Sequence, residues 1–178
     1  ITIEKAGSTE ITVPTECYAG GIIGDLISNN NQEHGLVYID DCTSTGNISA
    51  TEYTTSYAGG IVGRALYTVN MSKNTVASDS VISAGTAAGA VVGHTSNART
   101  LKLDLSSTNE RVGSLSDVGE INGSMVFSEG TLNGFPVAKT NNSSIAFAAG
   151  TSFSDGNISE HFEAETTYSY NGSDWVKE

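Results

Sequence analysis

The chain has 178 residues, which is enough for one hydrophobic core but not for a large multidomain enzyme. Its 8 basic and 20 acidic residues give a net charge of −12, which disfavours nucleic acid and anionic membrane surfaces as partners. Ser, Thr and Asn account for 57 residues and Gly for another 20, and these residue types favour short strands and turns over helices. We therefore expect an all-β, turn-rich module located outside the cytosol.

Three seven-residue segments resemble one another: YAGGIIG at residues 18–24, YAGGIVG at 57–63 and AAGAVVG at 87–93. The second begins 39 residues after the first, and the third begins 30 residues after the second. Periods of roughly 20 to 50 residues are typical of stacked structural units. The positions that define the repeat are Gly20, Gly21, Ile22, Gly24, Gly59, Gly60, Ile61, Gly63, Gly89, Val91 and Gly93.

Short segments with alternating apolar and polar residues follow each repeat. They lie at residues 37–40 after the first, at 69–72 and 80–83 after the second, and at 101–105 after the third. A period of two indicates strands, and no segment of a dozen residues shows helical spacing with caps. Each repeat unit therefore predicts about three short strands and no helix.

Three short strands per unit, repeated in register, favour a right-handed parallel β-helix in which each unit forms one coil. Equivalent strands of successive coils then lie about 4.8 Å apart and hydrogen-bond as parallel ladders. This arrangement predicts that Ile22, Ile61 and Val91 lie above one another. The glycines are expected at bends, where a positive φ or a close backbone approach is needed. The alternative is a sandwich of antiparallel hairpins, which would not require the same seven residues three times.

The repeat, together with the preceding CTSTGNIS at residues 42–49, resembles the GLUG-type repeats of bacterial surface proteins. The resemblance covers roughly residues 17–93 and departs from the pattern at Ala90, where a Gly is expected. It implies a large secreted or surface-attached protein, anchored to the outer membrane or the cell wall. Some proteins with such repeats are adhesins, and others are metallopeptidases that carry the repeats away from the catalytic domain.

The C-terminal part is less regular. We expect residues 1–106 to form the repeat coils, and residues 107–178 to form irregular further coils and a cap within the same domain. The segment DGNIS at residues 155–159 echoes TGNIS at 45–49, which favours further coils. Aromatic residues around Asn171-Gly172 predict a C-terminal β-hairpin that covers the open end.

Catalytic patterns are not found in the sequence. The repeated glycines do not fit G-x-G-x-x-G, and no H-E-x-x-H or G-x-S-x-G pattern occurs. Asp40 and Asp41 are adjacent carboxylates, but neighbouring residues of a strand face opposite sides, so we expect solvated or turn-capping roles. We assign no catalytic or metal-binding residue and no ligand-binding residue.

Cysteines, acidic residues and tyrosines leave alternatives open. Cys17 and Cys42 could form a disulfide or stay free. No cofactor is expected, although the excess of carboxylates would allow weak surface binding of calcium. Tyr18 and Tyr57 either contribute to a binding face or simply stack as equivalent positions of neighbouring coils.

The sequence therefore favours a non-catalytic extracellular module of a bacterial surface protein. We expect it to adhere to a host or matrix protein or a glycan, or to serve as a stalk. No direct membrane insertion is expected, since no stretch approaches the apolar length that spans a bilayer. The alternative function is that of a polysaccharide-active hydrolase or lyase, because parallel β-helices can host paired carboxylates.

Overall fold

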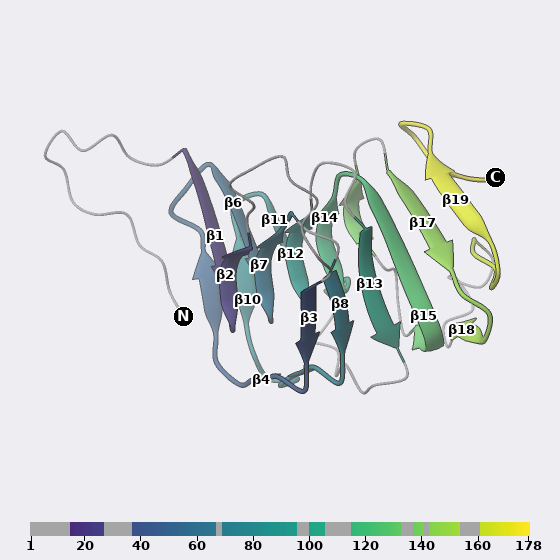
Figure 1. The fold of residues 1–178 in the computed structure, drawn as a ribbon. Helices are drawn as coiled ribbons and strands as arrows, with labels where there is room; N and C mark the ends of the chain where they lie inside the picture. Colours follow the sequence, from purple (N-terminus) through teal and green to yellow (C-terminus); the bar gives the residue numbers. More distant parts are fainter. Residues whose placement is uncertain are drawn as a thin grey trace, which may run out of the picture.

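The computed structural model describes residues 15–26, 37–66, 69–95, 100–105, 115–132, 137–140, 143–153 and 161–178. The regular elements of these residues are all strands, and there is no helix among them. The all-β prediction is therefore confirmed. Most strand pairs are parallel, and strands that are distant in the sequence lie side by side in one row across the molecule (Figure 1).

The chain passes repeatedly through the same set of sheets, and each passage is called a coil below. The first coil contains β1 (Glu16–Gly20), β2 (Ile23–Leu26), β3 (Val37–Asp40), β4 (Thr43–Ser44) and β5 (Ile48–Ala50). The second contains β6 (Thr55–Gly59), β7 (Val62–Ala65), β8 (Val69–Ser72), β9 (Thr75–Val76) and β10 (Ile82–Ala84). Five described strands per coil exceed the expected three, because the bends around Gly46 and Asn74 divide the stretches after β3 and β8 into further short strands.

Three more coils follow before the chain ends in a hairpin. The third coil contains β11 (Ala87–Gly89), β12 (Val92–Thr95) and β13 (Thr100–Leu105). The fourth contains β14 (Val118–Ile121) and β15 (Ser124–Leu132), and the fifth contains β16 (Val137–Thr140), β17 (Ser144–Phe147) and β18 (Thr151–Phe153). The hairpin is formed by β19 (Thr167–Tyr170) and β20 (Trp175–Lys177).

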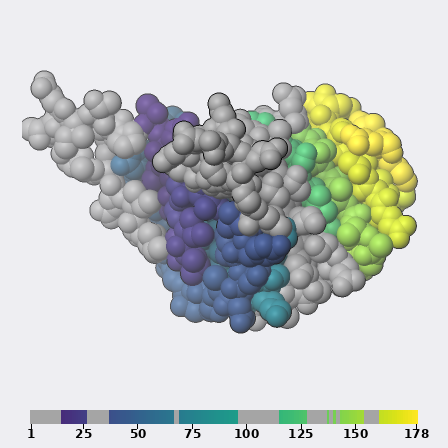
Figure 2. Space-filling model, viewed as in Figure 1, coloured from purple at the N-terminus to yellow at the C-terminus, as the bar shows by residue number. Residues whose placement is uncertain are grey.

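The strands assemble into three larger sheets and two small ones. One sheet has the order β1-β6-β11, the second β16-β14-β12-β7-β2 and the third β20-β19-β17-β15-β13-β8-β3. The pairs β4-β9 and β5-β10 form the small sheets. In the space-filling view the N-terminal strands and the C-terminal hairpin lie at opposite ends of the molecule (Figure 2).

The repeated segments lie in register, as predicted. Tyr18 pairs with Tyr57, which pairs with Ala87. The amide of Ile22 donates to the carbonyl of Ile61 at 3.0 Å, and the amide of Ile61 donates to that of Val91 at 2.9 Å. The parallel pairing excludes the antiparallel sandwich for these strands.

Burial of the repeat is not uniform along the stack. Ile61 is 0% exposed and Val91 is 2% exposed, whereas Ile22 in the first coil is 47% exposed. The prediction that all three are equivalent core residues is wrong for Ile22, because a coil stacks on it from one side only within the described residues. Further along the stack the core is formed by residues in register on the third sheet, where Phe127 pairs with Phe147 and their rings stack at 5.5 Å.

The repeat glycines are required by close approach and not by φ. Among the described residues, the glycines with positive φ are Gly123, Gly150 and Gly172, none of which belongs to the repeat. A Cβ at Gly59 would lie 2.0 Å from the carbonyl oxygen of Val62. Such an overlap excludes any side chain, so the expected positive φ is wrong and the expected close approach is right.

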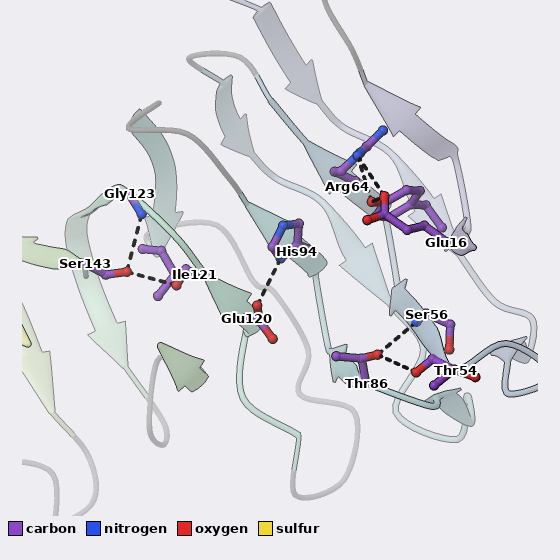
Figure 3. Close-up of polar contacts among 11 residues, drawn as sticks. Glu16, Thr54, Ser56, Arg64, Thr86, His94, Glu120, Ile121, Gly123 and Ser143 are labelled. Atoms are coloured by element: carbon purple, nitrogen blue, oxygen red, sulfur yellow. Dashed lines mark hydrogen bonds and ion pairs between the residues drawn. The ribbon is translucent and has the colours of Figure 1, made fainter. Parts of the chain in front are cut away.

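Buried polar side chains join successive coils at the bends. Asn74 is 1% exposed; its amide nitrogen donates to the carbonyl of Ile39 at 2.7 Å and its oxygen accepts from the amide of Cys42 at 3.1 Å. Ser56 and Ser143 similarly bond to backbone groups of neighbouring coils (Figure 3). These bonds satisfy backbone groups that the strand ladders leave unpaired at the bends.

The C-terminal hairpin is present at the predicted place. β19 pairs antiparallel with β17 and with β20, so the parallel ladder ends there. The loop is an Asx turn, because the side-chain oxygen of Asn171 accepts from the amides of Ser173 and Asp174, both at 2.9 Å. Gly172 has a φ of 98°, which accounts for the glycine after Asn171. The predicted echo at residues 155–159 lies outside the described residues.

Candidate functional site

The strands β2, β7, β12 and β14 carry a column of charged and titratable side chains. Asp25 pairs in register with Arg64, Arg64 with His94, and His94 with Glu120. Each of these residues directly follows a glycine at the same place in its coil. We call these four residues the charged column. The register of the parallel sheet brings together residues that are up to 95 positions apart in the chain.

Arg64 is held by partners in the first coil. Its Nε and Nη2 donate to the two carboxylate oxygens of Asp25 at 2.7 and 2.6 Å. Its Nη1 donates to the Tyr18 hydroxyl at 2.7 Å, and the guanidinium lies 3.8 Å from the centre of the Tyr18 ring. Glu16 is 3.7 Å from Nη1 and accepts a hydrogen bond from the Tyr18 hydroxyl. The hydrogen bonds to Asp25 raise the pKa of Arg64, so the guanidinium stays charged.

An aromatic stack runs beside the charged column. The rings of Tyr18 and Tyr57 are 5.6 Å apart with 6° between their planes, and Tyr57 stacks on His94 at 4.3 Å and 29°. This confirms the interpretation of Tyr18 and Tyr57 as equivalent positions of neighbouring coils. Burial raises the pKa of both tyrosines, and the carboxylates of Glu16 and Glu120 add to the effect. Both phenols are therefore neutral at physiological pH and unsuited to act as bases.

His94 and Glu120 form the most buried part of the column. Their side chains are 10% and 11% exposed, and Nδ1 of His94 lies 3.8 Å from Oε1 of Glu120 (Figure 3). Burial and the nearby Arg64 lower the pKa of His94 to about 4. The contact is therefore not an ion pair at neutral pH, since the imidazole is uncharged there.

The arrangement balances charge between coils and leaves little of it for substrate chemistry. Glu16 and Asp25 lie on the same guanidinium, so they satisfy the distance expected of a carboxylate pair in a glycosidase. Both oxygens of Asp25, however, accept bonds from Arg64, and Glu16 accepts from Tyr18. Neither carboxylate is positioned as a general acid or nucleophile for an added substrate.

The other sequence-predicted candidates are dispersed. Asp40 accepts a hydrogen bond from the Ser72 hydroxyl at 2.6 Å, and Asp41 occupies a bend with a φ of 60°. Cys17 and Cys42 are not bridged, and burial raises the pKa of the Cys17 thiol. Within the described ranges, no three His, Cys, Asp or Glu side chains are grouped to hold a metal ion, and no helix is long and apolar enough to cross a bilayer.

The sequence prediction placed functional weight on the glycines and missed the charged column. The glycines align in register but serve backbone packing. A signal was present, because Asp25, Arg64 and His94 each follow the last glycine of a repeat. The fourth member, Glu120, follows Gly119, which the repeat pattern did not include.

Comparisons of this chain with protein-family models, with curated proteins and with solved structures find no match.

Proposed function

We propose that this chain is a segment of a right-handed parallel β-helix of the GLUG-repeat type, and that it serves as a non-catalytic extracellular module of a bacterial surface protein. Its role is that of a stalk or an adhesive surface for a host or matrix protein or a glycan. The observation that carries the proposal is the register of the repeats, in which Tyr18, Tyr57 and Ala87 follow one another on adjacent parallel strands.

Stacked coils give an elongated surface made of equivalent positions. Backbone bonds join the repeats of the first three coils, and the parallel ladder continues through β14, β16 and β17. Such an architecture suits projection of a binding surface because each coil adds length without needing a new core.

Outward polar side chains supply an adhesive surface. On β5 and β10 the hydroxyls of Ser49 and Ser83 lie 3.3 Å apart, and Thr51 lies 3.4 Å from Ser49. On β3 the Tyr38 side chain is 64% exposed, which is unusual for a large ring. Hydroxyls and an exposed aromatic ring are the groups that carry contacts to glycans and to polar protein surfaces.

The proposal is tested by binding of the purified chain to a glycan array and to immobilised collagen, fibronectin and laminin. We expect saturable binding to at least one of these probes. The Tyr38→Ala variant should weaken it about tenfold, if Tyr38 contributes an anchor. Val81→Ala is the matched control, because Val81 is also an exposed apolar residue, at 60%, and its loss should leave binding unchanged.

The alternative of polysaccharide cleavage is tested with the same protein. Acidic and neutral polysaccharides are incubated with it, and reducing ends and unsaturated products are measured. Release that disappears in Glu16→Gln or Asp25→Asn would replace the adhesive role with a catalytic one.

A further inference from the structure

His94 is a buried titratable group for which the adhesive role has no use. Its Nδ1 is shielded from solvent and has no hydrogen-bond partner in the described part of the chain. The nearest carboxylate oxygen, from Glu120, is 3.8 Å away, which is longer than a hydrogen bond. Glu120 is instead a hydrogen-bond partner of Tyr57. The site is thus built for the neutral imidazole.

The groups around His94 do not favour a second positive charge. The strand β12 packs against β1, β6, β7, β11 and β14. β11 carries no titratable side chain, whereas the others present, in chain order, Glu16, Cys17, Tyr18, Tyr57, Arg64 and Glu120. Both tyrosines are neutral, Arg64 repels a cation, and Glu16 is engaged by Tyr18 and Arg64. Burial outweighs the attraction of the carboxylates.

We propose that His94 makes the third coil an acid-sensitive joint, at which β12 separates from β7 and β14 when the imidazole takes up a proton. His94 lies between the register partners Arg64 and Glu120 and beneath the ring of Tyr57. Water therefore reaches it only when β12 moves away from these neighbours. The opening divides the stack in its middle, whereas fraying of a repeat stack ordinarily begins at its ends.

The direction of the pH effect follows from proton linkage. An exposed histidine binds a proton near pH 6.5, whereas packed His94 does so near pH 4. Between these values the opened form holds the additional proton, so the stabilisation is complete above about pH 6.5 and is lost as the pH falls towards 4. From about pH 7.5 to about pH 5, the opening constant should rise by about 25-fold.

The test combines hydrogen exchange with a direct titration. Exchange is measured by mass spectrometry at about pH 7.5 and about pH 5 and corrected for the intrinsic rate. We expect the opening constants of amides in β12 and β14 to rise by about 25-fold, and those in β5, β10 and β19 to change much less. The imidazole of His94, followed by nitrogen-15 NMR, should titrate well below pH 6.

Variants separate His94 from general acid effects. His94→Phe keeps a ring on Tyr57 but cannot bind a proton, and His94→Gln is a second uncharged substitution. Both should abolish the local rise, whereas His161→Gln, at an exposed histidine, should retain it. A titration of His94 near pH 6.5, a rise that persists in both His94 variants, or a rise of equal size in every strand would overturn the proposal. If neither variant folds, the titration and the exchange map of the native chain decide it.

Discussion

At Gly63, an alanine would place its Cβ 2.3 Å from the carbonyl oxygen of Gly24 and 2.8 Å from the backbone nitrogen of Ala19. These atoms belong to the backbones of two other strands, which cannot move without breaking their ladders. Close approach of β7 to β1 and β2 therefore depends on the absence of a side chain. The repeat glycines are conformationally ordinary, and their role is to let sheets pack at backbone distance.

This packing predicts the effect of Gly63→Ala. The free energy of unfolding should fall by at least about 2 kcal/mol, because an overlap with backbone atoms forces the strands apart. Gly46→Ala is the matched control, since a Cβ at Gly46 meets nothing within 4 Å, and its effect should stay within about 0.5 kcal/mol. Urea denaturation of both variants measures the difference. Equal stability of the two would contradict this account of the glycines.

Asn74 gives a second prediction at this scale. Asn74→Ala removes both bonds to the first coil and leaves the carbonyl of Ile39 and the amide of Cys42 without their partner. Each unsatisfied buried group costs about 1–3 kcal/mol, so the loss should be at least about 2 kcal/mol. Ser72→Ala removes only the exposed bond to Asp40 and should cost less than about 1 kcal/mol. Chemical denaturation with matched slopes checks the ranking, which a similar loss in both variants would refute.

Residue-level prediction from the sequence was uneven for a physical reason. The glycines and Tyr57 recur as identical letters, so the repeat itself identifies them. Asp25, Arg64, His94 and Glu120 occupy one column but differ in charge, and a search for similar residues passes over them. Complementary neighbours in a parallel ladder stabilise one another through difference, which identity of sequence does not reveal.

At the scale of elements, the C-terminal hairpin ends the stack with an aromatic cluster. Phe162 is 1% exposed and its ring lies 5.2 Å from Phe147, 5.0 Å from Tyr168 and 6.2 Å from Trp175. These rings cover the end of the core where the parallel strands stop. β19 also pairs with the outer edge of β17, which would otherwise be open to pairing with other chains.

Removal of the central ring should release the hairpin. Phe162→Ala is expected to destabilise the chain by about 3–5 kcal/mol and to increase exchange of amides in β17 and β19 first. Val176→Ala, at a side chain that is 47% exposed, should change stability by less than about 0.5 kcal/mol. A dye that binds exposed apolar surface should bind the Phe162 variant more strongly. Unchanged exchange in β17 would show that the cluster is not what holds the hairpin.

The elements of the first half were easier to predict than those of the second. The first three coils carry the repeat, whereas β14 begins at Val118-Gly119 and retains only one glycine. In β16 the position that pairs with Val118 is Val137, followed by alanine. Backbone pairing holds these strands in register without the motif, so the continuation of the ladder beyond residue 106 rested on weak sequence signals.

At the scale of the whole molecule, the net charge of −12 acts against the folded state. Compact folding brings the acidic side chains together, and Arg64 compensates only those in its own column. Raising NaCl from about 20 mM to about 300 mM should therefore raise Tm, because salt screens the repulsion. Differential scanning calorimetry at neutral pH measures the shift. A fall in Tm would mean that local ion pairs dominate over the net repulsion.

The separation between register partners decreases along the stack. It is 39 residues from Tyr18 to Tyr57, 30 from Tyr57 to Ala87, 26 from Val92 to Val118 and 19 from Val118 to Val137. In a protein of identical repeats, a strand can pair with the wrong neighbour and leave every loop the same length. Here a displaced strand would need a loop of a length that the chain does not have at that place. The unequal loops therefore give each coil only one place in the order of assembly, which guards the chain against folding with a coil omitted or exchanged.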